Sequence, residues 1–107
     1  KMVFLDCYTT WCGPCRMMAN TIFTKNEVGE YFNKHFVSYK LDMERGEGPA
    51  LGKKYGVKAF PTMIFMDAEG NVRHTIVGSK SANELIEEAK TKWCSNRGTP
   101  FCPQPWP

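Results

Sequence analysis

Two cysteines separated by two residues are the part of this 107-residue chain whose type and spacing could do chemistry. Cys12 and Cys15 follow an apolar run at residues 2–5. Side chains three positions apart on a helix share one face, so these sulfurs can form a disulfide or open to two thiols. Just before a helix, Cys12 would meet unpaired N–H groups and the positive end of the helix dipole, which lower a cysteine pKa from about 8.5 to roughly 3.5–7.5. The spacing therefore predicts reversible dithiol chemistry with an acidified Cys12.

The two residues between the cysteines fit the same chemistry. Pro14 has no N–H, and its φ is already suited to the first positions of a helix. Gly13 has no side chain, so the backbone of a partner can come close to the attacking sulfur. We therefore expect Gly13 and Pro14 to contact the molecule that reacts with Cys12.

Hydrophobic periodicity and turn residues predict the elements that hold this dithiol in place. The expected strands span residues 2–8, 37–43, 62–67 and 72–77. The expected helices span about 12–20, a segment that starts with a capping box at 24–27, residues 48–55, and a final helix that starts with a capping box at 81–84. The helical region after Cys15 is expected to break near Thr21 and Ile22. The order is β-α-β-α-β-β-α, an α/β fold with a crossover first and a hairpin later.

The run of residues 11–15, Trp-Cys-Gly-Pro-Cys, resembles the active site of the thioredoxin family. This resemblance implies a thioredoxin-like fold, with a central mixed sheet of about four strands flanked by helices. We expect one domain at residues 1–93, followed by a proline-rich tail at 94–107. The resemblance assigns Cys12 as the nucleophile that attacks a client disulfide and Cys15 as the thiol that resolves the mixed disulfide. We expect no cofactor and no bound metal.

Residues outside the dithiol are also similar to the family's pattern. Asp6, in an otherwise apolar strand, is similar to the family's buried acid, and Lys40 to the lysine near that acid. The resemblance makes Asp6 the acid and base for Cys15, because a carboxylate in apolar surroundings has a raised pKa. A structural acid paired with Lys40 is the alternative. Compared with full thioredoxin the usual N-terminal strand and helix are missing, and segment 20–28 resembles the C-terminal reductase domain of bacterial periplasmic thiol:disulfide interchange proteins.

The same resemblance implies a surface that binds clients. Phe60-Pro61-Thr62 is similar to the family's cis-proline loop, although only about 5–6% of X-Pro bonds in folded proteins are cis. In relatives, the backbone of the residue before this proline pairs with an extended client segment, and that residue is Phe60 here. Trp11 would add an apolar surface beside the sulfur. An ordinary turn at Pro61 is the alternative.

Cys7 and the two histidines need separate explanations. We expect Cys7 to be a small buried apolar residue. With Cys12 and Cys15 it has the C-x4-C-x2-C spacing of plant-type ferredoxin ligands, but a cluster needs a fourth nearby thiolate, and Cys7 lies on a rigid strand. A zinc site meets the same objection, and we interpret His35 and His74 as surface residues rather than ligands.

Cys94 and Cys102 bracket a loop in the proline-rich tail. A structural disulfide between them would favour an oxidising compartment. A tail without this bond is the alternative. Together with the resemblance to interchange proteins, these two cysteines favour the bacterial periplasm, and a cytoplasmic location is the alternative.

Composition argues against several classes of partner. The net charge is +3 and the basic residues are scattered, so the chain has no nucleic-acid footprint. No apolar run approaches the roughly 20 residues needed to span a bilayer, so we expect no stable membrane insertion of this segment. We expect a monomer whose partners are client proteins with disulfides and an upstream thiol electron donor.

The function that these observations favour is that of a thiol-disulfide oxidoreductase, which reduces or exchanges protein disulfides. The Gly-Pro pair between the cysteines resembles the reducing members of the family. A disulfide isomerase or oxidase of the same fold is the alternative, because the redox poise depends on surroundings that the sequence does not fix. A redox-inactive binding module is a further alternative, but binding alone does not require a second thiol.

Overall fold

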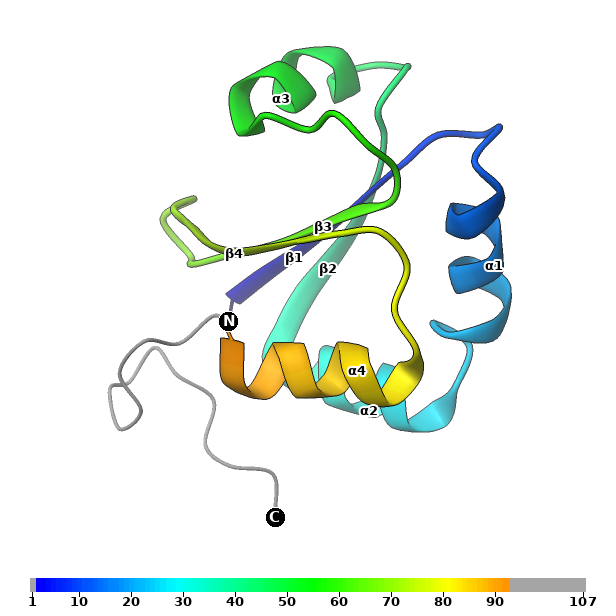
Figure 1. Ribbon diagram of the computed structural model, residues 1–107. Coiled ribbons are helices and arrows are strands. Elements are labelled where there is room, and N and C mark those ends of the chain that lie inside the picture. The colour runs from blue at the N-terminus through cyan, green and yellow to red at the C-terminus, as the bar shows by residue number, and fades with distance from the viewer. Residues whose placement is uncertain (1, 93–107) are drawn as a thin grey trace.

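The computed structural model describes residues 2–92, and these form one sheet with helices on both of its faces (Figure 1). The elements are β1 (Met2–Tyr8), α1 (Gly13–Thr21), α2 (Asn26–His35), β2 (Phe36–Asp42), α3 (Gly48–Tyr55), β3 (Thr62–Met66), β4 (Val72–Val77) and α4 (Ala82–Glu87), followed by a π-helical turn (Glu88–Lys92). This order confirms the predicted β-α-β-α-β-β-α arrangement, and the strand limits agree to within a residue.

The four strands form a mixed sheet in the order β2-β1-β3-β4. Strand β1 is parallel to β2, which places Asp6 opposite Lys40. Strand β3 is antiparallel to both β1 and β4, and Cys7 lies opposite Thr62. The two strands that lead into and out of the predicted site are therefore neighbours at the centre of the sheet.

The larger core lies between the sheet and the helices α1, α2 and α4. An aromatic cluster fills it: the ring centroids of Phe4 and Phe32 are 4.7 Å apart, those of Phe4 and Phe65 5.1 Å, and those of Phe36 and Phe65 5.4 Å. Each such pair contributes about 0.5–1.5 kcal/mol beyond the area it buries. This core fixes α1, and with it the cysteine pair, against the sheet.

A smaller core lies on the α3 side of the sheet and contains Cys7. Its other buried members are Leu5, Met43, Ile64 and Met66. Burial raises the pKa of the Cys7 thiol to about 11, and the nearby Asp6 charge adds to the rise. Cys7 is therefore a buried apolar residue, as the sequence predicted.

The ends of the helices confirm one predicted capping box and correct the other. The final helix starts as expected: the Glu84 N–H donates to Ser81 Oγ at 3.2 Å, and the Ser81 N–H donates to Glu84 Oε1 at 3.3 Å. The break after α1 is also confirmed. The box predicted at 24–27 is wrong, because the Thr24 hydroxyl donates to the Asn20 carbonyl at 2.8 Å, and Lys25 occupies the N-cap position of α2 without a side-chain hydrogen bond to the helix.

The predicted hairpin between β3 and β4 is present. The Asp67 carboxylate accepts hydrogen bonds from the backbone N–H groups of Glu69 and Asn71, at 3.0 and 2.9 Å. Gly70 has a φ of 91°, a backbone conformation that residues other than glycine rarely adopt. These hydrogen bonds, with that from the Asn71 backbone first, hold the pKa of Asp67 below its usual range.

The expected tail falls outside the described residues, and so does the Cys94–Cys102 pair. Within residues 2–92, no helix has the length and apolar character needed to cross a bilayer.

Candidate active site

Strand β1 leads the chain directly to the cysteine pair. After β1 the backbone turns, and the Cys12 N–H donates to the Thr9 carbonyl at 3.3 Å. Helix α1 then begins at Gly13, with Pro14 in its first turn. Cys12 is the N-cap of this helix, and its Sγ accepts a hydrogen bond from the Cys15 N–H at 3.1 Å. The sulfur of Cys12 thus lies at the positive end of the helix, where the sequence predicted it.

The two cysteines are joined by a disulfide in the structure, and their Cα atoms are 5.3 Å apart. Both side chains are buried, whereas Gly13 and Pro14 are exposed. No heavy atom lies within 4 Å of the position that a Cβ on Gly13 would take. The first turn of α1 also holds no acidic residue. A partner can therefore approach the disulfide over Gly13, and no negative side chain in that turn opposes a thiolate at Cys12.

Asp6 lies on the same side of the sheet as α1 and is 6% exposed. Burial raises its pKa from 3.8 to about 6, and the positive charge of Lys40 opposes part of this rise. The Lys40 ammonium lies 5.0 Å from the centroid of the Tyr8 ring. Asp6, Lys40 and Cys15 line one cavity of about 110 Å³. The structure therefore brings the predicted acid and the predicted resolving cysteine to the same cavity.

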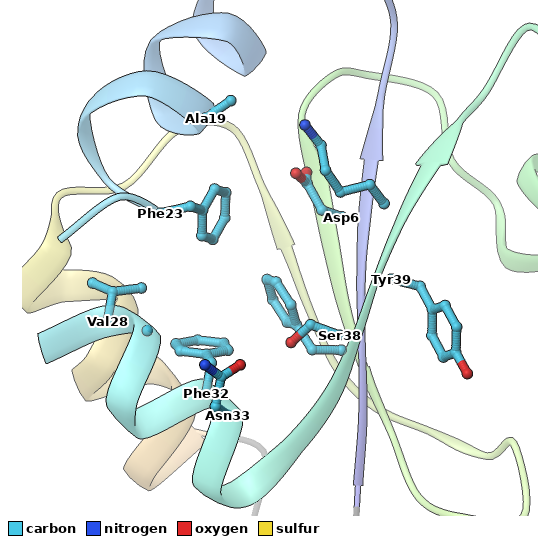
Figure 2. A pocket seen from close by; sticks show the side chains of 11 residues that line it. Asp6, Ala19, Phe23, Val28, Phe32, Asn33, Ser38 and Tyr39 are labelled. Carbon is cyan, nitrogen blue, oxygen red and sulfur yellow. The ribbon is translucent and has the colours of Figure 1, made fainter. Parts of the chain in front are cut away.

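A second cavity, of about 280 Å³, lies on the other side of Asp6. Figure 2 shows Asp6 at one end of this cavity, Phe32 and Asn33 at the other, and Phe23 in the wall between them. Its lining comes from α1, α2, β1 and β2 and from the segment that joins the two helices. Asp6, Lys40 and Ala19 line both cavities, so the buried acid separates two hollow regions.

The predicted proline loop lies next to the end of β1 that leads to the cysteine pair. The peptide bond between Phe60 and Pro61 is cis, and Pro61 is fully buried. The loop leads into β3, and the pairing of Thr62 with Cys7 places it next to the end of β1 that leads to Cys12. The Thr62 hydroxyl also donates to the Ala59 carbonyl at 2.6 Å, which closes the loop.

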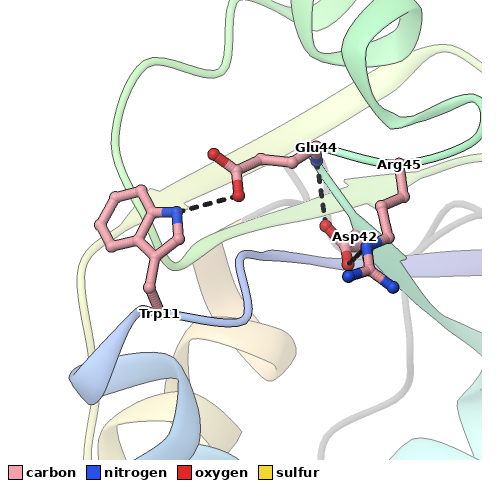
Figure 3. A network of polar contacts seen from close by, with 4 residues as sticks. All are labelled: Trp11, Asp42, Glu44 and Arg45. Carbon is pink, nitrogen blue, oxygen red and sulfur yellow. Dashed lines mark hydrogen bonds and ion pairs between the residues drawn. The ribbon is translucent and has the colours of Figure 1, made fainter.

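Trp11 precedes Cys12 in the chain, contacts the proline loop through Phe60 and is 63% exposed. Its ring meets Phe60 edge to face, with centroids 6.0 Å apart. Its Nε1–H donates to Glu44 Oε1 at 2.9 Å, and Glu44 is itself placed by a hydrogen bond from its N–H to Asp42 Oδ1 at 3.0 Å (Figure 3). Sequence reasoning missed Glu44, because 33 residues separate it from Trp11 and only the fold joins them.

The remaining candidate ligands lie apart from this site. Cys7 faces the α3 side of the sheet, whereas Asp6 faces α1. The His35 ring packs at a tilt against that of Tyr31 in α2, and His74 Nε2 lies within hydrogen-bond distance of Glu88 Oε2, at 2.8 Å. In the described part of the chain, no group of three His, Cys, Asp or Glu side chains could hold a metal ion.

A mixed four-stranded sheet with helices on both faces and a cysteine pair at the start of the first helix is the arrangement of a thioredoxin-like protein. Residues 1–92 match the family model of the thioredoxin-like domain. The chain therefore belongs to the thioredoxin-like family, and Cys12 and Cys15 fit its CXXC redox motif.

Relatives in several organisms support the same assignment. Thioredoxin-like protein slr0233 of Synechocystis is 32% identical over 82% of this chain and 78% of its own length. Thioredoxin Y2 of Arabidopsis thaliana chloroplasts is 37% identical over 81% of this chain. The chain spans about half of that longer relative, with 48% of its length covered by the match. Two further relatives are thioredoxins of Listeria species. Chloroplast and bacterial relatives together therefore indicate no single compartment. These relatives support protein-disulfide oxidoreductase activity.

Solved structures agree with the fold. A Bacteroides thetaiotaomicron protein that has been proposed to be a disulphide-isomerase is 46% identical and has a TM-score of 0.79 over 89% of this chain and 78% of its own. A thioredoxin from Thermus thermophilus is 22% identical, with a TM-score of 0.75 over 82% of this chain and 70% of its own, and shows the shared fold.

Proposed function

We propose that this chain reduces disulfides in client proteins, with Cys12 as the nucleophile and Cys15 as the resolving thiol. The observation that carries the proposal is the position of Cys12 Sγ as the cap of α1, where it accepts the Cys15 N–H at 3.1 Å. A sulfur that caps a helix is stabilised as a thiolate, and the thiolate is the form that attacks disulfides. The function rests on this chain's own dithiol and uses no cofactor.

The reaction has two steps, and each exchanges one sulfur–sulfur bond for another. The Cys12 thiolate attacks a client disulfide, a bond forms between Cys12 and one client sulfur, and the other client sulfur leaves as a thiolate. Cys15 then attacks the sulfur of Cys12, and the second client sulfur leaves. The client gains two electrons and two protons, and the pair ends as the disulfide that the structure contains. An upstream thiol donor must then reduce this disulfide.

Asp6 is the proposed acid and base for Cys15. Cys15 attacks as a thiolate, so its proton needs an acceptor inside the covered site. Asp6 lines the same cavity as Cys15 and has a pKa of about 6, close to neutral pH. The rise of this pKa from the ordinary 3.8 toward working pH suits a group that takes up a proton and then returns it.

The proposed client surface lies around the buried disulfide and includes the exposed residues next to it. Trp11 supplies an apolar face, and the exposed Gly13 and Pro14 leave room for an extended chain. We propose that the backbone of Phe60 pairs with this chain. Pro61 has no N–H that could compete for the same bonds.

The alternative function is isomerisation of client disulfides. Its support is the similarity to the Bacteroides protein, which has been proposed to be a disulphide-isomerase. The same dithiol performs either reaction, and the reduction potential of the pair selects between them.

A redox titration with trapped intermediates tests the proposal. The chain is equilibrated in glutathione or dithiothreitol buffers, alkylated and mapped by mass spectrometry, and insulin reduction is followed in parallel. We expect a midpoint well below that of the glutathione pool, near the roughly −270 mV of thioredoxin. Cys12→Ser should abolish the reaction, Cys15→Ser should accumulate the mixed disulfide at Cys12, and Cys7→Ala should retain activity.

Each result of the titration has a defined meaning. A midpoint near that of the glutathione pool would favour the isomerase. If Cys12 and Cys15 never exchange with a client, the chain is a redox-inactive binding module instead.

We also propose that this chain works as a monomer in an extracytoplasmic compartment such as the bacterial periplasm. The support is the pair Cys94 and Cys102, whose spacing suits a structural disulfide, and the similarity of segment 20–28 to interchange proteins. Alkylation of protein taken directly from its native source tests the location. Free thiols at both residues would favour the cytoplasm.

A further inference from the structure

Arg16 carries a positive charge at the dithiol end of α1, and the proposed function does not yet use it. The residue is exposed and directly follows Cys15. Side chains on a helix point back toward its N-terminus, and here Nη2–H of the guanidinium donates to the Thr10 carbonyl at 2.8 Å. A guanidinium has five N–H donors, so this contact leaves most of them for another acceptor. The hydrogen bond therefore holds a positive charge beside the segment that precedes Cys12.

Glu44, in the loop after β2, carries a negative charge that is tied to the next residue of the same segment, Trp11. Its Oε1 accepts from Trp11 Nε1–H at 2.9 Å, and Figure 3 shows the carboxylate extended toward the indole nitrogen. The neighbouring Arg45 pairs with Asp42 at 3.9 Å, so its charge is offset within the loop. An ionised carboxylate offers about four acceptor sites, so the Trp11 contact leaves room for a second donor.

The two charges are not neutralised by side chains of opposite sign. Among residues 2–92, neither the Arg16 guanidinium nor the Glu44 carboxylate forms an ion pair. Lys40 adds a positive charge on the side of Arg16, because both residues line the cavity of about 110 Å³. Asp6, the other charged residue described in that lining, is 6% exposed. The surface around the dithiol is therefore positive beside α1 and negative in the loop after β2.

We infer that Arg16 and Glu44 select clients by the charges next to the reactive disulfide: Arg16 binds an acidic side chain on one side of the attacked cysteine, and Glu44 binds a basic side chain on the other side. The inference rests on the proposed function and names the client segment that its site prefers. The two hydrogen bonds order these side chains before a client arrives, so binding loses less side-chain entropy. Opposite charges at two places also fix the direction in which an extended client segment lies.

The test measures reduction of short peptide disulfides by the full chain. Each probe is a disulfide-linked dimer of one peptide with blocked termini, so either cysteine is attacked in the same surroundings. The peptides differ in a single residue, Asp, Asn or Lys, placed either before or after the cysteine. The reduced chain is mixed with excess peptide at low ionic strength and neutral pH, and the rate of a single turnover is measured against peptide concentration. The half-saturation concentration and the limiting rate then separate binding from the chemical step.

Two variants remove the charges and keep the hydrogen bonds that place the side chains. Arg16→Gln keeps an amide N–H for its carbonyl partner, and Glu44→Gln keeps an oxygen acceptor for the indole. Arg73→Gln and Glu69→Gln are the matched controls, one for each sign of charge. Both control positions are exposed and lie near the end of β4 that is away from the proline loop.

We expect the parent to reduce the Asp peptide about threefold faster than the Asn peptide in one placement, and the Lys peptide about threefold faster in the other, the size of an exposed charge pair. Arg16→Gln should abolish only the preference for Asp, and Glu44→Gln only the preference for Lys. Both changes should appear in the half-saturation concentration and not in the limiting rate. Salt at about 1 M should remove both preferences, and the control variants should keep them.

The Asn peptide separates an effect on the client from an effect on the sulfur. If Arg16→Gln slows the Asp and Asn peptides equally, the guanidinium acts on the dithiol and the inference is wrong. It is also wrong if the parent shows no charge preference, if the preference is the same in both placements, or if Arg73→Gln loses it as Arg16→Gln does. A parent that reduces none of the peptides would instead refute the proposed function, on which the inference rests.

Discussion

Replacing Asp6 by Asn removes a buried acid, and the stability of the folded chain should then depend on pH in a different way. The pKa of Asp6 is raised to about 6 in the folded protein, mainly by burial, against 3.8 as its ordinary value. Folding therefore disfavours the ionised form. Well below pH 3.8 Asp6 is protonated in both states and costs nothing, and the cost grows as pH rises from about 3.8 to about 6. An asparagine carries no such cost at any pH.

The size of the effect follows from the shift. About two pKa units, at about 1.4 kcal/mol for each, give about 3 kcal/mol. The free energy of unfolding of Asp6→Asn, minus that of the parent, should therefore be about 3 kcal/mol larger at pH 8 than at pH 3.5. Other groups titrate equally in both proteins, so the subtraction removes them. The same variant should slow resolution of the mixed disulfide by Cys15. Replacing this one residue should therefore raise stability and lower activity.

Urea unfolding followed by circular dichroism measures this difference, with the disulfide closed in both proteins. Asp67→Asn is a control of opposite sign, because hydrogen bonds hold the pKa of Asp67 below its usual range. Its stabilising contribution is present at neutral pH and is lost as pH falls, so the deficit of that variant should close in acid. A gap between Asp6→Asn and the parent that stays constant with pH, or widens in acid, would refute the reasoning.

Two further predictions concern the space around two glycines and the client surface. Gly48→Ala should lower the free energy of unfolding by at least about 3 kcal/mol, because an added Cβ would overlap the Asp42 carbonyl. Gly29→Ala in α2 meets no atom within 4 Å and should raise the free energy of unfolding by roughly 0.5–1 kcal/mol. Equal urea midpoints for the two variants would contradict this pair of expectations. Trp11→Ala should raise KM for insulin severalfold and leave the rate with dithionitrobenzoate unchanged, and Glu44→Ala should have a smaller effect of the same kind, because it frees the indole without removing it. Equal losses with both substrates would show that Trp11 acts on the sulfur rather than on the client.

The fold was predictable because its signals are local. An apolar run, a turn residue or a capping box acts within a few positions, and the pair Ser81 and Glu84 forms the contacts that its spacing predicts. The failure at Thr24 has an equally local cause. The end of α1 leaves carbonyl groups unpaired, and the Thr24 hydroxyl bonds to that of Asn20 instead of capping α2. The Thr24 hydroxyl could either bond to the end of α1 or cap α2, and the sequence alone does not show which hydrogen bond forms.

The candidate site was predictable only in part. Cys12 and Cys15 are neighbours on one helix, so their spacing alone places them together. The contact of Trp11 with Glu44 joins β1's end to the loop after β2, and periodicity carries no information about it. The position of Thr9 is similar: its sequence neighbours are obvious, but its covered hydroxyl and the cavity beside it exist only after α1 packs on the sheet.

The strand order determines how local opening of the sheet affects the site. β1, which delivers Cys12, and β3, which follows Pro61, are each hydrogen-bonded to two neighbours, whereas β2 and β4 are edge strands with one neighbour each. Amide hydrogens of edge strands exchange through local openings of low free energy, and those of central strands exchange only when most of the domain opens. Fraying at either edge strand should therefore leave β1 and β3, and with them the segments that lead to the cysteine pair and from the proline loop, in register.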